Sequence, residues 1–323
     1  MILAGIDEAG YGPLLGPLVV GCSAFELPDA DPACEPLPCL WKRLNKLVGK
    51  SKSRSGKKIH VNDSKLVYSP ATGLKELERA VLAIATTWDQ WNTGLADLLA
   101  KVAPDALTDV TSYPWYEPDG DVFPIEQDAT SVRLLANGLK AEMGRTGTPC
   151  VHLAARVVFE RQFNRMVGAT RNKASVLFSI AAIHLDRLIR AYGDRGLVVF
   201  CDRQGGRSHY GQLLRLMFDD WALEITRESD ERSDYRLLKG PHVVRVIFAE
   251  KAEAQCMSVA VASMLSKYLR EALMRRFNAY WRKHLPDIEP TAGYYGDGTR
   301  FLGQIDVKRR ELGVPDEQLI RSR

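Results

Sequence analysis

The sequence predicts an α/β fold in which a mixed central sheet is flanked by helices. Short apolar runs, typical of buried strands, alternate along the chain with longer segments in which apolar residues recur at helical spacing. The 323 residues are 46% hydrophobic and 26% charged, which is the composition of a globular protein with a large core. The sequence contains no internal repeat or low-complexity tract, so we expect one domain that carries inserted segments.

The predicted strands begin with an amino-terminal hairpin. Residues 1–5 and 16–25 are apolar, and a Gly/Pro-rich turn separates them. Residues 196–201 form a continuous apolar run that ends at Asp202, which is typical of a fully buried central strand. Further strands are predicted near residues 151–158, 222–227 and 243–248.

Helices are predicted around residues 71–87, 173–192, 210–218 and 257–280. The clearest is the second, in which apolar residues recur at intervals of three and four: Leu177, Ala181, Leu185 and Leu188. One face of this helix is therefore expected to be buried.

Two segments differ from the rest of the chain in charge. Residues 42–58 contain eight Lys or Arg residues and no acid, whereas residues 88–130 are acidic. The basic segment fits either an arm that contacts phosphates or a solvated loop. We expect a single domain over 1–323, with a basic insert at 28–58, an acidic inserted subdomain at about 88–148 and a helical, basic part at about 257–323.

Aromatic residues are concentrated in the acidic insert. We expect Trp88, Trp91 and Trp115 to form a small core there rather than a platform on which bases stack.

The net charge, the cysteines and the lack of long apolar stretches limit the class of protein. The formal net charge of +4 is too small to indicate a nucleic-acid-binding protein by itself. The six cysteines include no C-x-x-C pair, which argues against a disulfide framework or a structural zinc site and favours a reducing compartment. No apolar stretch approaches the ~20 residues of a membrane span and no signal peptide is evident, so we expect a cytoplasmic protein without a membrane partner.

The acids at the ends of predicted core elements are the most informative residues. Asp7 and Glu8 end the first strand, Asp202 follows the buried run, and Glu253 precedes the last long helix. Taken singly, each fits a turn or a helix cap. Buried together they would cost several kcal/mol each without a cation, and oxygen ligands suit Mg²⁺ or Mn²⁺. The chemistry implied is phosphoryl transfer with two metal ions about 3.5–4 Å apart.

The first of these acids lies in a recognisable motif. Residues 5–20, GIDEAGYGPLLGPLVV, closely resemble the signature of type 2 ribonucleases H, G-x-D-E-A-G-R-G-P-x-x-G-P-x-V-V. A glycine-rich dinucleotide loop is the competing interpretation. However, G-x-G-x-x-G followed by a helix is absent, and Pro13 and Pro17 would obstruct a helix at this point.

Further segments match the family in its order. Residues 62–65, NDSK, resemble its D-S-K element, and Asp202 with its downstream glycines resembles the third-carboxylate segment. Residues 251–267 resemble K-A-D/E followed by the A-A-S-I-L-A-K helix, with Glu253 in the fourth acidic position, as in ribonucleases HIII. Residues 293–299, GYYGDGT, resemble the G-Y-P-S-D-P-x-T of ribonucleases HII, shortened by one residue.

The resemblance covers about residues 1–27, 59–86 and 150–300 and does not explain the inserts. Two lysines in the matching segments, Lys65 and Lys267, have two possible roles. Each could lie beside the carboxylates or a phosphate, or it could lie on the surface.

The resemblance also implies the residues that contact substrate. Tyr294 corresponds to the tyrosine that stacks on the substrate, with Tyr295 as the alternative. Gly10, Tyr11 and Gly12 stand at the family's G-R-G or G-K-G tripeptide, whose backbone amides read a 2′-hydroxyl. Because Tyr11 replaces the basic residue, we expect weaker cleavage at single embedded ribonucleotides than in continuous hybrids.

These similarities imply a ribonuclease H-like fold and an endoribonuclease that hydrolyses the RNA strand of RNA/DNA hybrids, leaving 5′-phosphate and 3′-hydroxyl ends. The implied catalytic and metal-binding residues are Asp7, Glu8, Asp202 and Glu253, with Mg²⁺ or Mn²⁺ as cofactor and a monomer as the active form. Two alternatives remain: a non-catalytic module that binds hybrids or duplexes, and a nuclease of the same fold that cuts branched or damaged DNA.

Overall fold

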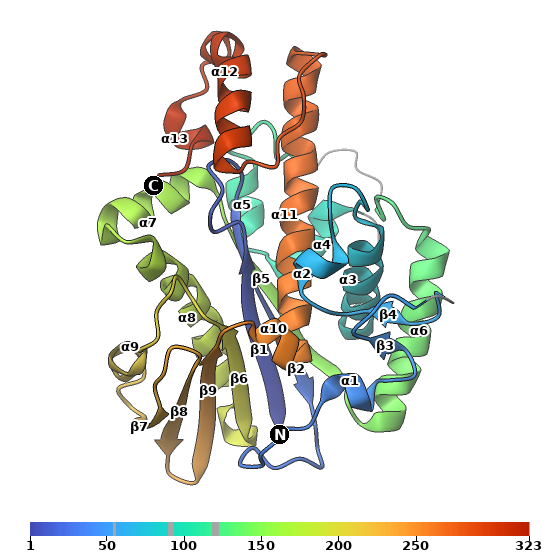
Figure 1. Cartoon of the computed structure of the whole chain (residues 1–323), viewed down its shortest axis with the longest axis vertical. Coiled ribbons are helices and arrows are strands. Elements are labelled where there is room, and N and C mark those ends of the chain that lie inside the picture. The colour runs from blue at the N-terminus through green and yellow to red at the C-terminus, as the bar shows by residue number, and fades with distance from the viewer. Residues whose placement is uncertain (54–55, 90–93, 118–122, 323) are drawn as a thin grey trace.

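The protein is described here by a computed structural model, which covers residues 1–53, 56–89, 94–117 and 123–322. In this part of the chain, seven strands form one sheet in the order β5-β2-β1-β6-β9-β8-β7 (Figure 1). The strands are β1 (Ile2–Ala9), β2 (Leu18–Glu26), β5 (Cys150–Val158), β6 (Leu197–Asp202), β7 (Ala222–Arg227), β8 (Arg232–Lys239) and β9 (His242–Ala249), and a separate small sheet pairs β3 (Val48–Gly49) with β4 (Ile59–His60).

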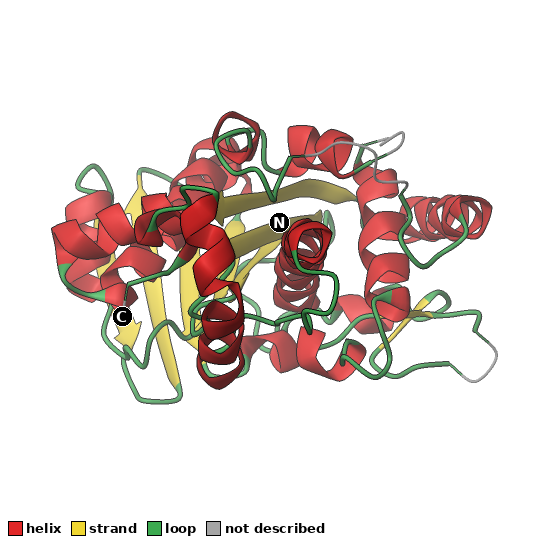
Figure 2. Ribbon diagram, turned by 90° about the horizontal axis from the view of Figure 1, so that it is seen from above, coloured by secondary structure: helices red, strands yellow, loops and turns green. Residues whose placement is uncertain are grey.

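Helices cover the sheet on both sides, as the view from above shows (Figure 2). They are α1 (Leu40–Arg43), α2 (Ser64–Val67), α3 (Lys75–Trp88), α4 (Leu95–Val102), α5 (Ala106–Val110), α6 (Ala129–Thr146), α7 (Glu160–Thr170), α8 (Lys173–Tyr192), the 3₁₀ turn η1 (Gly193–Arg195), α9 (Gly211–Met217), α10 (Ala252–Gln255), α11 (Met257–His284), α12 (Tyr295–Glu311) and α13 (Asp316–Leu319). The predicted fold class, a mixed sheet flanked by helices, is therefore confirmed.

The centre of the sheet is parallel and its margins are antiparallel. β1 pairs in parallel with β6, and β6 pairs in parallel with β9, whereas β2, β5, β7 and β8 join in antiparallel pairs. The carboxyl ends of β1, β6 and β9 consequently lie at the same edge of the sheet.

Strand β1 is buried on both faces. Its residues Ile2, Ala4 and Ile6 belong to the core that includes α8, whereas Leu3 belongs to the core that includes α11. Because both faces are covered, the strand is apolar without alternation, which is why it was recognisable in the sequence.

Helix α11 packs against β1 and β2 with almost no space between the backbones. A Cβ atom on Gly5 would lie 2.1 Å from the backbone nitrogen of Val259, and one on Gly21 would lie 2.5 Å from the carbonyl oxygen of Ala262. The Ser258 hydroxyl donates a hydrogen bond to the carbonyl of Leu3 (2.9 Å). Glycine is therefore required on these strands, and the contact fixes α11 beside the end of β1.

Most predicted elements are present, and several others were not foreseen. The hairpin of β1 and β2 is confirmed by their antiparallel pairing, and α8 has the bounds that the periodicity predicts. β8 was not predicted, because polar and charged residues interrupt its apolar positions. Nor were α6 and α7, in each of which glycine interrupts the helical pattern, whereas α12 lies within the part at about 257–323 that we expected to be helical.

The acidic segment shares its core with the rest of the protein. Trp115 is 2% exposed, and its ring lies 5.8 Å from that of Phe277 and 6.1 Å from that of Trp281, both on α11. Trp115 is thus buried and is not a stacking platform, as expected, but the expectation of a core confined to the insert is wrong for this residue, because its ring also packs on α11. Trp91 lies outside the described residues.

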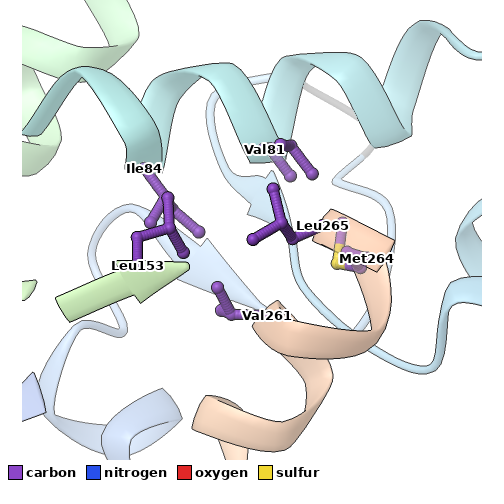
Figure 3. Close-up of a pocket in the computed structure, with 7 residues that line it drawn as sticks. Val81, Ile84, Leu153, Val261, Met264 and Leu265 are labelled. Atoms are coloured by element: carbon purple, nitrogen blue, oxygen red, sulfur yellow. The ribbon is translucent and has the colours of Figure 1, made fainter. Parts of the chain in front are cut away.

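A small apolar void marks the junction of α3, β5 and α11. Val81 and Ile84 of α3, Leu153 of β5 and Leu265 of α11 point into it (Figure 3). Its volume of about 10 Å³ and its wholly apolar lining make it a packing gap without room or hydrogen-bond partners for a ligand.

None of the helices in the described part of the chain combines the length and apolar character needed to cross a bilayer.

Candidate active site

Asp7 and Asp202 lie at neighbouring positions on adjacent strands. In the parallel pair of β1 and β6, Ile6 is aligned with Cys201, so the next residue on each strand is an aspartate. Asp202 is also aligned with Ala249, the last residue of β9. The structure thus brings together two of the acids that the sequence placed at strand ends.

Glu253 reaches the same edge through the short helix α10. The amide of Ala252, the first residue of α10, donates a hydrogen bond to Oδ1 of Asp202 (3.0 Å). Lys251, directly before the helix, has a φ of 53°, a left-handed conformation that turns the chain from β9 into α10. Glu253 is half-buried, and burial followed by the negative charge of Asp202 raises its pKa.

The acids occupy one weakly hydrated region and repel one another. Burial, and then the charge of Asp202, raises the pKa of Glu8 to about 7. Burial, and then the charges of Glu8 and Asp202, raises the pKa of Asp7 well above its usual value. Burial also raises the pKa of Asp202. Ionising all of these groups at once is therefore unfavourable unless positive charge comes close to them.

Lys65 brings positive charge to the acidic cluster. Its ammonium lowers the pKa values of Glu8, Asp202 and Glu253, which places it beside the cluster. Its position is set at the start of α2, where Asp63 accepts a hydrogen bond from the Lys65 amide (2.9 Å).

Lys267 has a different environment. Its ammonium pairs with Glu271 (2.6 Å) and lies 4.6 Å from the ring centre of Tyr68. Of the two lysines for which sequence left the role open, Lys65 therefore faces the carboxylates and Lys267 does not.

Serines of α11, which sequence analysis did not single out, join the motifs to one another. The Ser263 hydroxyl donates to the hydroxyl of Ser64 (3.1 Å), and it lies close enough to the Asp7 carboxyl to lower its pKa. The Ser266 hydroxyl donates to the carbonyl of Asp7 (3.1 Å). The signal available in sequence was the row of small residues on one face of this helix.

The tripeptide Gly10–Gly12 follows β1 directly. Gly10 has a φ of +86°, a conformation that favours glycine. Tyr11 is half-buried, and a Cβ atom on Gly205 would lie 3.2 Å from its hydroxyl, so the side chain extends to the loop after Asp202. Burial, and then the charge of Glu8, raises the pKa of Tyr11. Tyr11 thus lies between the acids and the α8 side of the molecule.

The two candidate tyrosines differ in their surroundings. Tyr294 and Tyr295 are 53% and 57% exposed. Tyr295 lines a pocket of about 280 Å³ together with Gly12, Pro13, Leu14, Lys173 and Arg321, whereas Tyr294 is not part of its lining. The carbonyl of Gly293 accepts hydrogen bonds from the amides of Leu14 (2.7 Å) and Leu15 (3.1 Å), which holds this segment against the glycine loop.

The acidic cluster has the donor chemistry of a divalent-cation site. Within the described ranges, no group of three or more His, Cys, Asp or Glu side chains has the arrangement of a formed metal site. The four acids Asp7, Glu8, Asp202 and Glu253 nevertheless offer carboxylate oxygens, the ligands that Mg²⁺ and Mn²⁺ prefer. Burial is the main cause of their raised pKa values, and positive charge placed among them would favour the ionised forms that bind a cation.

Comparison with known proteins gives matches among solved structures alone. No protein-family model and no curated protein matches the chain. The solved structures include ribonuclease HII of Archaeoglobus fulgidus, in a complex with PCNA, with 15% identity and a TM-score of 0.45 over 100% of this chain and 95% of that one.

Two further structures show a similar degree of likeness. Ribonuclease H2 of Pyrococcus horikoshii is 12% identical, with a TM-score of 0.41 over 99% of this chain and 92% of that one. Bst-RNase HIII in complex with Mn²⁺ is 14% identical, with a TM-score of 0.43 over 99% of this chain and 66% of that one. These three solved structures are a ribonuclease HII, a ribonuclease H2 and a ribonuclease HIII.

Proposed function

We propose that this chain is a metal-dependent endoribonuclease that hydrolyses the RNA strand of RNA/DNA hybrids. The observation that supports this most strongly is the mutual electrostatic influence of Asp7, Glu8, Asp202 and Glu253, which come from β1, β6 and α10. These are the acids of the motifs that resemble type 2 ribonucleases H. A protein that only bound nucleic acid would gain nothing from aiming carboxylates at a polyanion.

The four acids would hold the cation through their carboxylate oxygens. Bound Mg²⁺ or Mn²⁺ supplies an activated water and neutralises the charge that develops on the leaving oxygen. Lys65 favours the ionised forms of Glu8, Asp202 and Glu253 and so prepares them for cation binding. In the reaction, a water oxygen bonds to phosphorus, the P–O3′ bond breaks and O3′ takes a proton, which leaves 5′-phosphate and 3′-hydroxyl ends.

The loop after β1 would select the ribose. A 2′-hydroxyl distinguishes RNA from DNA, and the backbone amides of Gly10, Tyr11 and Gly12 are the donors that the family resemblance assigns to it. The pocket lined by Gly12 and Tyr295 lies beside these residues and is open to a nucleotide.

Cleavage of labelled duplexes of one sequence, with Mg²⁺ or Mn²⁺, tests the proposal. We expect the hybrid to be cut and duplex RNA and duplex DNA to be spared. Asp7→Asn and Asp202→Asn should lower the rate by at least about 100-fold, whereas Asp219→Asn, at an exposed aspartate, should not change it. Activity within about tenfold of the parent in either site variant would refute the assigned roles.

The other outcomes separate the alternatives. Tight hybrid binding without cleavage by the parent would indicate a binding module. Cleavage of branched or damaged DNA, with hybrids spared, would indicate a nuclease of the same fold acting on DNA.

The tyrosines can be assigned with two substrates. We expect continuous hybrid to be cut faster than a DNA duplex with one embedded ribonucleotide. Tyr294→Ala and Tyr295→Ala should be compared on both, and the tyrosine that contacts the junction is the one whose loss slows the second substrate more. Equal rates on both substrates, unchanged in both variants, would show that neither residue senses the junction.

The proposed enzyme acts as a monomer in the cytoplasm, with a hybrid duplex as its partner. The six free thiols fit a reducing compartment, and light scattering of the purified protein tests the monomer.

A further inference from the structure

A buried arginine from the far end of the chain holds the glycine loop. Arg321 is 2% exposed, and its guanidinium donates hydrogen bonds to the carbonyls of Gly10 and Tyr11, the latter at 3.0 Å. Its own amide donates to the carbonyl of Leu14 (2.9 Å). One residue thus contacts three carbonyls of the loop that follows Asp7 and Glu8.

Helix α7 in turn fixes the position of Arg321. The Asn164 side chain donates to the carbonyl of Ile320 (2.7 Å) and accepts from the amide of Ser322 (2.6 Å). The guanidinium of Arg321 also lies 3.9 Å from the ring centre of Phe163. Arg321 is therefore held by its neighbours on both sides and by an aromatic ring, which leaves its side chain little freedom.

Burying the charged side chain of Arg321 destabilises the folded state. Burial lowers the pKa of Arg321 to about 10, so the side chain is charged at neutral pH. The nearby charge of the buried Arg270 disfavours it further, while Glu160 opposes that effect. The guanidinium donates its hydrogen bonds to backbone carbonyls of the loop, so this buried charge holds the loop in one conformation.

The geometry of the peptide bond relates these carbonyls to substrate recognition. In a trans peptide the C=O of one residue and the N–H of the next point in opposite directions within one plane. Arg321 binds the carbonyls of Gly10 and Tyr11, so the amides of Tyr11 and Gly12 point away from it. A cation on the carbonyl oxygens also polarises these N–H groups and makes them stronger donors.

We propose that Arg321 is a positioning residue for ribose recognition: it orients and polarises the backbone amides of Tyr11 and Gly12 so that they can donate to a 2′-hydroxyl. This role rests on the proposed function. It also brings positive charge to the tripeptide in which Tyr11 stands where the resembled family has a basic side chain. Arg321 also lines the pocket beside Gly12, but the role proposed for it is to position the amides and not to take part in the reaction.

The test measures preference for ribose rather than activity alone. Binding of an RNA/DNA hybrid and of a DNA duplex of the same sequence is measured by fluorescence anisotropy in EDTA, so that nothing is cut. The ratio of the two dissociation constants reports ribose recognition, because phosphate contacts affect both duplexes alike.

The variants are Arg321→Met, Arg321→Lys and a matched control, Arg310→Met, on α12 at a side chain that is 72% exposed. We expect Arg321→Met to reduce the preference for hybrid by about tenfold, the loss of one to two hydrogen bonds. Lysine should restore part of it by keeping the charge and a donor. Arg310→Met should change both affinities by the same factor. In cleavage of the hybrid, Arg321→Met should raise KM and leave kcat within about twofold.

Each result has a defined meaning. If Arg321→Met does not fold, Asn164→Ala replaces it, because this change releases residues 320–322 while keeping the arginine, and it should reduce the preference about threefold. An unchanged preference in a folded variant, or an equal loss of affinity for both duplexes, would overturn the positioning role while leaving the proposed function intact. A parent that neither prefers nor cuts the hybrid would overturn the proposed function and this role with it.

Discussion

Replacing Glu8 by Gln should stabilise the protein at about pH 8 and leave its stability unchanged near pH 4.5. The change removes one of the mutually repelling charges and keeps the size of the side chain. Burial, and then the charge of Asp202, raises the pKa of Glu8 from its ordinary 4.5 to about 7. At 1.36 kcal/mol for each pH unit, ionised Glu8 therefore costs the folded state about 3 kcal/mol.

The pH dependence has a definite sign. Between pH 4.5 and about 7 the folded protein keeps the Glu8 proton while the unfolded chain has released it, so the free energy of unfolding of the parent falls as pH rises through this window. Glutamine has no proton to release. The advantage of Glu8→Gln over the parent should consequently be near zero at pH 4.5 and reach about 3 kcal/mol above pH 7.

Guanidinium unfolding in EDTA at several pH values between these limits measures the effect. The matched control is Glu289→Gln, at a glutamate that is 77% exposed, which should shift the free energy of unfolding by less than about 0.5 kcal/mol at every pH. An advantage of Glu8→Gln that is the same at both ends of the window, or a loss of stability at about pH 8, would refute the electrostatic reasoning.

The effect of divalent cations on the stability of Glu8→Gln tests whether Glu8 is a ligand. A cation that binds only the folded state at about 100 times its Kd stabilises the parent by about 2.7 kcal/mol. Glu8→Gln removes one proposed ligand, so Mg²⁺ or Mn²⁺ should stabilise the parent more than the variant and narrow the difference between them. A difference that is unaffected by either cation would count against Glu8 as a ligand.

Three further predictions concern packing and pH. Gly5→Ala should lower the free energy of unfolding by about 3 kcal/mol, because the new Cβ would lie 2.1 Å from a backbone nitrogen of α11. In the control Gly144→Ala, the new Cβ would have no atom within 4 Å, so the free energy of unfolding should rise by about 0.5 kcal/mol. Equal effects of the two changes would contradict the close packing of α11. Burial lowers the pKa of His184 to about 3, so the unfolded chain binds a proton there at a higher pH than the folded protein does. The free energy of unfolding should therefore fall by about 4 kcal/mol as pH falls from 6.5 to 3. In acid titrations followed by circular dichroism, His184→Gln should largely abolish this loss. Trp115→Ala should cost about 3–5 kcal/mol without changing kcat for each folded molecule, and a large fall in kcat would show that the acidic segment contributes to the chemistry.

The motifs of the site were visible in the sequence because they are continuous. Each motif is read from a few neighbouring residues: the Gly/Pro-rich turn after β1, the acid that ends β6 and the acid within α10. The sequence places Asp7 and Asp202 at the ends of core strands, and the parallel register of β1 and β6 sets them at neighbouring positions.

Other parts of the site depend on contacts that local pattern does not encode. Lys65 and Lys267 looked equivalent in sequence, yet only the packing of α2 directs the charge of Lys65 towards the acids. Trp115 packs on the nearby rings of Tyr113 and Tyr116, as a core within the insert would require. It also packs on rings of α11, more than 150 residues further along the chain. Nothing near a residue in sequence indicates which distant element will cover it.

Periodicity and turn chemistry are properties of short segments. For this reason the alternation of strands and helices, the apolar face of α8 and the positions of the four acids at the ends of core elements could be predicted before the fold was known. No local pattern indicates that Arg321 contacts Gly10, or that Tyr295 and not Tyr294 lines the pocket beside Gly12. Those contacts depend on how helices and loops pack in three dimensions, and the free energy of such packing comes from surfaces that are brought together only when the whole chain folds.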